Sequence, residues 1–151
     1  MKKIKWTLTL VMLSMLLVLP AWAASDILVE AVTVTVVPSG KMASAFMVIT
    51  NQGTSDDRLV SCSVKEAPTA RCEVHNVEDG KMFPVEGVDI EAGKTLLLKK
   101  GSYHLMVMDI AEPLSEKATV VLNFSKAGAI ETPAVVKTAE AAMGGMMKSG
   151  H

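Results

Sequence analysis

The chain has 151 residues, half of them hydrophobic, and a formal net charge of −1 at pH 7. This length suits one folded domain with a substantial core. A nearly neutral chain without a basic stripe or interleaved aromatic residues lacks the features of a nucleic-acid-binding protein, so we expect no nucleic-acid partner.

Residues 1–23 have the three parts of a secretory signal peptide. Three lysines lie within residues 1–5, residues 6–19 are predominantly apolar, and the small-residue segment Ala21-Trp22-Ala23 follows. The apolar run is shorter than the about 20 residues that a membrane-spanning helix needs. We therefore expect cleavage after Ala23, with Ala24 as the next candidate, and an exported protein that is not an integral membrane protein. An uncleaved N-terminal anchor is the alternative. No Cys follows the run directly, which argues against a lipid anchor.

Residues 24–137 show the patterns of β-structure. The segment 32–36 alternates apolar and polar residues, and short runs of the same kind recur between turn signals such as Asp79-Gly80. We predict an all-β domain, a Greek-key β-sandwich of immunoglobulin-like or cupredoxin-like type. The predicted strands are 32–36, 45–50, 58–64, 71–76, 82–85, 88–90, 95–99, 103–110, 117–124 and 130–136.

Pro133 lies within the last of these segments, and because proline cannot donate to a sheet ladder we expect an edge strand there. The predicted core is Val32, Val34, Val48, Leu97, Val120, Leu122 and Phe124.

The two cysteines, Cys62 and Cys72, lie on consecutive predicted strands joined by a short turn around Pro68. An exported protein meets an oxidising compartment, which favours a cross-strand disulfide. A metal thiolate at one of them is the alternative that the sequence leaves open.

Beyond residue 23 the chain has eight Met but only three His. Thioether sulfur and imidazole together suit Cu(I). His104 and Met106 point to the same side of a strand because they are two residues apart. His75 ends a strand and Met82 follows the Asp79-Gly80 turn, so a hairpin can bring them together. We predict a Cu(I) site made by His75, Met82, His104 and Met106.

The remaining methionines are expected to have roles other than that of primary ligands. Met108 continues the face of His104 and is expected to pack or to serve as a substitute ligand, and Met42 and Met47 are expected in the core or at a sheet edge. The segment 138–151 is predicted to be a flexible tail. Its donors Met143, Met146, Met147 and His151 leave open whether it binds a second copper ion.

Several motifs resemble those of the periplasmic PCu(A)C copper chaperones. Met82 is followed by 21 residues and then by His104-Leu105-Met106, as in that family's signature. Glu73-Val74-His75 and Asp57-Arg58-Leu59-Val60 match further family segments, and the resemblance spans about residues 34–137. One departure is the seven-residue step from His75 to Met82, which is about four residues shorter than the usual hairpin.

The resemblance implies a periplasmic protein that binds Cu(I) and delivers it to a respiratory enzyme. We expect this protein to be a monomer. The implied recipients are the copper subunit of cytochrome c oxidase and Sco-type thiol proteins. An enzymatic role is not indicated, because no Ser/His/Asp set, nucleotide-binding glycine loop or Cys-x-x-Cys motif is present.

Two alternatives remain at this stage. A blue-copper electron carrier needs a Cys thiolate, two His and a weak axial Met, and Cys72, His75 and Met82 occur in a suggestive order. A metal-free interaction module of the same fold would leave the four predicted donors scattered in space.

Overall fold

The computed structural model describes residues 25–139, and the regular elements of this part are strands. They are β1 (Ile27–Val36), β2 (Met42–Asn51), β3 (Asp57–Val64), β4 (Arg71–Glu78), β5 (Lys81–Val85), β6 (Val88–Ile90), β7 (Thr95–Leu98), β8 (His104–Met108), β9 (Lys117–Phe124) and β10 (Gly128–Thr138). The predicted all-β class is confirmed. Within residues 25–139 no helix has the length and apolar character to cross a membrane.

The predicted signal peptide and the four donors of the predicted tail lie outside the described residues. The last strand, β10, runs to Thr138 and therefore includes the first residue of the segment predicted to be tail.

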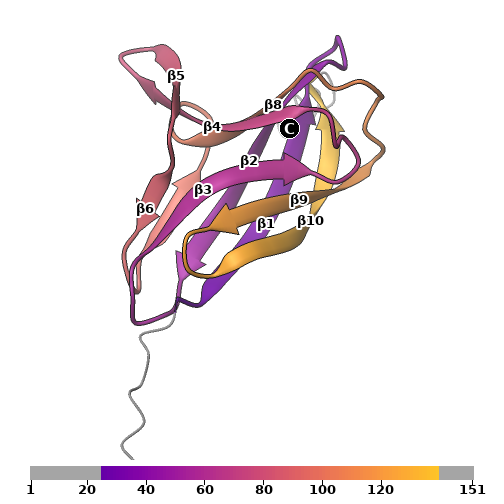
Figure 1. Ribbon diagram of the computed structural model, residues 1–151. Helices are drawn as coiled ribbons and strands as arrows, with labels where there is room; N and C mark the ends of the chain where they lie inside the picture. Colours follow the sequence, from indigo (N-terminus) through magenta and orange to yellow (C-terminus); the bar gives the residue numbers. More distant parts are fainter. Residues whose placement is uncertain (1–24, 140–151) are drawn as a thin grey trace, which may run out of the picture.

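The strands form one hydrogen-bonded sheet that folds over on itself as a sandwich. Its order is β5-β4-β8-β2-β1-β10-β9-β3-β6 (Figure 1). Outside this order, β7 pairs with the second half of β2. Although β3 is far from β4 and β8 in this order, it packs against both of them. The β4–β8 end of the sheet therefore faces the β3 end, and the core lies between them.

The core is built from alternate residues of each strand. In β2 the inward residues Ala43, Ala45, Met47 and Ile49 are at most 2% exposed. The prediction that Val48 belongs to the core is wrong, because Val48 points to the other face and is only half-buried. Hydrophobicity could not distinguish the two faces, since residues 45–49 are all apolar.

Leu97 was also wrongly assigned to the core. It is 46% exposed, whereas its neighbour Leu98 is buried, and a run of three leucines again hides the alternation. The other predicted core residues are buried: Val32, Val34, Val120, Leu122 and Phe124.

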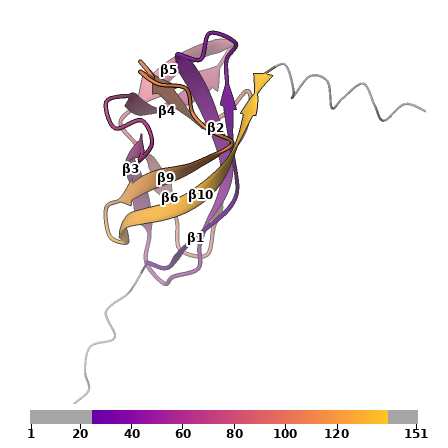
Figure 2. The same cartoon turned by 90° about the vertical axis from the view of Figure 1, so that its right-hand side faces the viewer.

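β10 is an interior strand, so the expectation of an edge strand is wrong. It pairs antiparallel with β9 along its length and parallel with β1 (Figure 2). Pro133 lies opposite Thr119 of β9, and the pairing with β1 begins only at Val135. At Pro133, β10 has only one neighbouring strand, β9. The N–H that proline lacks is therefore not needed for a hydrogen bond to a second strand.

A buried carboxylate joins the start of β3 to the turn between β9 and β10. Asp57 is 4% exposed and accepts hydrogen bonds from the backbone N–H groups of Arg58, Lys126 and Ala127 at 2.7–2.9 Å. Burial raises the pKa of Asp57, but these N–H groups and the Ser25 hydroxyl lower it, and the net pKa lies below the ordinary value of 3.8.

We expect Asp57→Asn to destabilise the fold by about 1.5–3 kcal/mol at neutral pH, the range for hydrogen bonds to a charged group. Because the pKa is lower in the folded state, this stabilisation is present above about pH 4 and is lost as the pH falls through the folded-state value. Urea unfolding of both proteins checks this, and a difference that stays constant down to about pH 2 would contradict it.

Candidate metal centre

The pairing of β4 with β8 places the two described histidines side by side. His75 and His104 are direct partners in the antiparallel register, and their ring centroids are 6.0 Å apart. The next pair, Val74 and Leu105, is buried and points into the core. Since side chains alternate along a strand, the two imidazoles project together from the opposite face.

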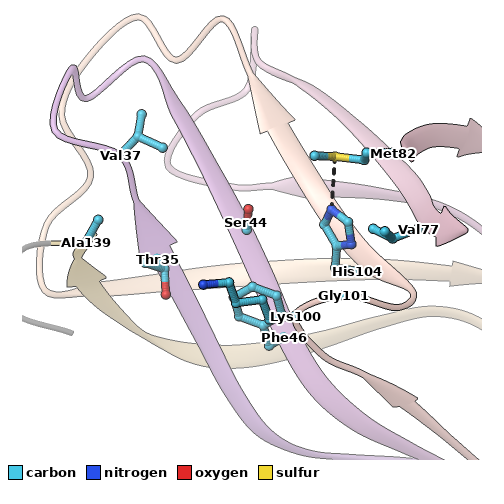
Figure 3. A pocket seen from close by; sticks show the side chains of 10 residues that line it. All are labelled: Thr35, Val37, Ser44, Phe46, Val77, Met82, Lys100, Gly101, His104 and Ala139. Atoms are coloured by element: carbon cyan, nitrogen blue, oxygen red, sulfur yellow. Dashed lines mark hydrogen bonds between the residues drawn. The ribbon is translucent and has the colours of Figure 1, made fainter. Parts of the chain in front are cut away.

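The β4–β5 hairpin brings the first methionine to this pair. Asp79 and Gly80 have φ values of 51° and 73°, which a two-residue type I′ turn requires. The turn sets Met82 opposite Val77 and places the Met82 Sδ atom 3.3 Å from the His104 Nε2 atom (Figure 3). The shortened hairpin therefore still brings the Met82 side chain next to His104.

Met106 reaches the same surface from β8. It lies two residues after His104, and the Ser44 hydroxyl on β2 donates to its Sδ atom at 3.3 Å. The structure thus brings all four predicted donors to one surface, the outward face of β2, β8, β4 and β5, which we call the donor face. On it lie Ser44, Glu73, His75, Met82, His104 and Met106.

The donors differ in their exposure to solvent. His75, His104 and Met106 are at most 9% exposed, whereas Met82, on the terminal strand β5, is 53% exposed. Three donors are thus held in a protected position, and the fourth is accessible from outside.

In the neutral His104 ring, the contact with the Ser102 carbonyl fixes which nitrogen carries the proton. Its Nδ1 atom lies 2.8 Å from the Ser102 carbonyl oxygen, and a carbonyl can only accept. Nδ1 therefore donates, and Nε2 has a free lone pair directed at the Met82 sulfur. Two electron-pair donors face each other, an arrangement that a bound cation stabilises.

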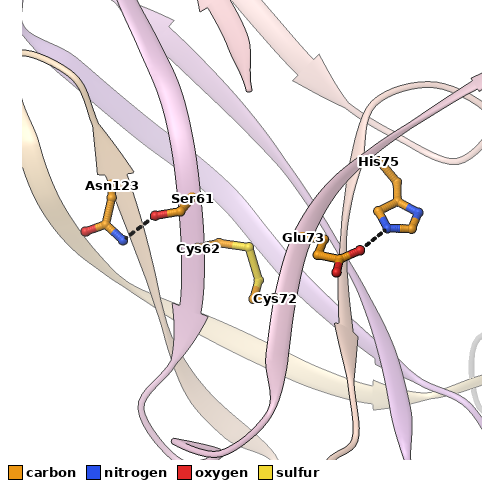
Figure 4. Close-up of a disulfide and its surroundings, with 6 residues drawn as sticks. All are labelled: Ser61, Cys62, Cys72, Glu73, His75 and Asn123. Atoms are coloured by element: carbon orange, nitrogen blue, oxygen red, sulfur yellow. Dashed lines mark hydrogen bonds and ion pairs between the residues drawn. A yellow bond between two sulfur atoms is a disulfide. The ribbon is translucent and has the colours of Figure 1, made fainter. Parts of the chain in front are cut away.

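A carboxylate sets the tautomer of His75. Its Nε2 atom lies 2.9 Å from the Glu73 carboxylate, which accepts the ring proton (Figure 4). The Nδ1 atom is then left with a lone pair, and it is buried without a hydrogen-bond partner in the described part of the chain. Arg71 holds Glu73 in turn, and it also binds Asp109. A histidine that ligates a metal commonly donates its other nitrogen to such a carboxylate.

A mainly apolar pocket of about 540 Å³ adjoins His104 and Met82 (Figure 3). The Phe46 ring forms one wall, with its centroid 6.3 Å from that of His104. Its lining residues are Thr35, Val37, Ser44, Phe46, Val77, Met82, Lys100, Gly101, His104 and Ala139. Apolar walls limit the competition of water with weak thioether donors.

Three supports of the site were not predicted from the sequence: Glu73, Ser44 and the Ser102 carbonyl. Glu73 is detectable in principle, because it lies two residues before His75 and so shares its face. The contacts of Ser44 and Ser102 depend on strand pairing and on the loop before β8, and neither leaves a local pattern.

Cys62 and Cys72 form a disulfide with a Cα–Cα distance of 5.4 Å (Figure 4). The predicted bond is confirmed, but β3 and β4 are not paired, so the bond connects the two facing parts of the sandwich. Cys72 pairs with the inward-pointing Val107 and lies on the core side of β4. The alternative of a metal thiolate is therefore wrong, because both cysteines of the chain are bonded to each other.

The sequence model of the LpqE-like family, described as "Putative lipoprotein LpqE-like", matches residues 23–136. The chain belongs to the LpqE-like family. No curated protein matches the sequence at a significant level.

Three solved structures are similar to this LpqE-like chain, and two of them are PCuAC domains. The apo PCuAC domain from PmoF1 superposes with a TM-score of 0.66 at 21% identity, covering 78% of this chain and 98% of its own. The copper-bound PCuAC domain from PmoF2 gives 0.63 at 19% identity, covering 78% and 97%. The solution structure of Cu(I)-DR1885 from Deinococcus radiodurans gives 0.58 at 25% identity, covering 78% and 81%. The predicted resemblance to the PCu(A)C family is confirmed.

The hydrogen bonds of the site predict different tautomers for its two histidines. In the metal-free protein, with both rings neutral, His104 should carry its proton on Nδ1 and His75 on Nε2. Imidazole ¹⁵N shifts distinguish the two forms, and a His104 ring protonated on Nε2 would contradict this description of the site.

Proposed function

We propose that this protein binds Cu(I) through His75, Met82, His104 and Met106 and delivers it to another protein in the periplasm. The observation that carries the proposal is the approach of the Met82 sulfur to the unprotonated nitrogen of His104, 3.3 Å apart, beside His75. The recipient we propose is a respiratory copper enzyme, namely cytochrome c oxidase, or a Sco-type protein that serves it.

The chemistry of the donor set supports Cu(I) as the cargo. Two thioethers and two neutral imidazoles are soft or borderline ligands, and they leave the single positive charge of Cu(I) unchanged. The site contains no thiolate, so an oxidising compartment cannot disable it by disulfide formation. Two similar structures, a copper-bound PCuAC domain and Cu(I)-DR1885, contain the same metal.

The exposure pattern supports transfer rather than storage or catalysis. Met82 is exposed on a terminal strand, so a recipient can approach the ion from that side while the buried donors still hold it. Transfer proceeds by ligand exchange, in which the Met82 thioether leaves as a recipient thiolate arrives. Four protein donors leave no open position for a substrate, unlike catalytic metal sites, so we propose a carrier and not an enzyme. We propose that this carrier acts as a monomer.

The localisation follows from residues 1–23, which we propose act as a cleaved signal peptide. The name of the family refers to lipoproteins. However, the first cysteine of this chain is Cys62, which lies within β3 and is bonded to Cys72. A lipid anchor at the end of the leader therefore has no acceptor thiol, and we propose release into the periplasm.

Neither alternative function is favoured by the structure. A blue-copper centre needs a thiolate, but Cys72 is in a disulfide and faces the core, away from His75. A metal-free module predicts scattered donors, whereas His75, Met82 and His104 lie together.

Titration of Cu(I) against a competing chromophoric chelator tests the proposal. We expect His104→Ala and Met106→Leu each to weaken Cu(I) binding by about tenfold or more, which corresponds to about 1.4 kcal/mol. Met47→Leu is the matched control, because Met47 lies in β2 with its side chain in the core and should leave the affinity unchanged. Affinities that do not differ between the control and the two site variants would overturn the ligand assignment.

A further inference from the structure

Two methionines on the donor face are not used by the proposed copper site. Met42 begins β2, Met108 ends β8, and the two residues are direct partners in the antiparallel register. Their neighbours Ala43 and Val107 are buried in the core, so Met42 and Met108 project from the opposite side. Met42 is 38% exposed, although strand residues facing water are usually polar.

Met106 connects this pair to the proposed site. It lies two residues before Met108 on β8, and its register partner is Ser44, two residues after Met42. Side chains of direct partners have Cβ atoms about 4.5–5.5 Å apart, and diagonal neighbours lie about 7–8 Å apart. Three flexible thioether side chains at these positions can converge on a single ion.

The charged register partners of Met106 and Met108 on β4 are Glu73 and Arg71, and together they do not oppose a cation. Arg71 is the register partner of Met108 on β4, but its guanidinium binds the carboxylates of Asp109, at 2.9 Å, and of Glu73, at 3.5 Å. The two carboxylates outnumber the one guanidinium, so this part of the surface has no net positive charge from these groups.

We propose that Met42, Met106 and Met108 form a second site for Cu(I), made of thioethers alone. It rests on the proposed function in that Cu(I) is the cargo, and Met106 is the donor that both sites share. Lacking imidazole, it binds more weakly than the site at His104. An ion held there reaches His104 by exchanging Met42 and Met108 for His75 and Met82, while Met106 stays bound.

Methionine-methyl NMR of the full chain, titrated with Ag(I) as a redox-stable probe for Cu(I), tests the second site. In the unaltered protein the first equivalent should shift the methyl signals of Met82 and Met106. In the double variant His75→Ala/His104→Ala, which lacks the imidazoles of the stronger site and leaves Met106 free, silver should shift those of Met42, Met106 and Met108 together. Unchanged Met42 and Met108 signals in this variant, while the methionines after residue 139 respond to the excess, would overturn the second site. Unchanged Met82 and Met106 signals in the unaltered protein would instead overturn the proposed function.

A pair of variants excludes unspecific binding to exposed methionines. In the His75→Ala/His104→Ala background, Met42→Leu should abolish the silver-induced shift of Met108, because it removes one donor of the site. Met47→Leu changes the same side chain on the core side of β2 and should leave the Met108 shift intact. Independent responses of Met42 and Met108 would show separate surface contacts and contradict a shared site.

Discussion

The register between β4 and β8 is the constraint on which the candidate site depends. It sets His75 directly opposite His104, and it also sets Val74 opposite Leu105 in the core. A slip of one residue would reverse both faces, exposing Leu105 and burying the imidazole of His104. The apolar core therefore fixes the position of the four proposed donors, although its own side chains point away from them.

The inward face of β4 contributes to the core, and its outward face contributes to the candidate site. Its inward side contributes Val74 and the disulfide from Cys72 to β3, which anchors the strand to the facing part of the sandwich. Its outward side carries His75 and Glu73. Because the cysteines are bonded to each other on the core side, oxidation stabilises the strand without consuming a donor, which is compatible with thioether and imidazole chemistry in an oxidising compartment.

Much of this arrangement could be predicted from the sequence, because it depends on local periodicity. The His-x-Met spacing places His104 and Met106 on one face, and the Asp79-Gly80 pair gives the tight turn that returns Met82. The family resemblance, which rests on the same motifs, led to the same donors.

Features that depend on nonlocal pairing could not be predicted in the same way. The inward face of β2 is hidden in an unbroken apolar run, so Val48 was wrongly assigned to the core. The parallel pairing of β10 with β1 makes an interior strand out of a segment that contains Pro133. Likewise, the Ser102 carbonyl that sets the tautomer of His104 acts through the fold of a loop.

Copper K-edge X-ray absorption of the protein with one equivalent of Cu(I) tests the central claim most directly. If the two histidines bind the ion together with Met82 and Met106, the atoms coordinating copper should include both imidazole nitrogen and thioether sulfur. A shell of nitrogen and oxygen alone would show that the methionine sulfurs do not bind the ion, and would contradict the account.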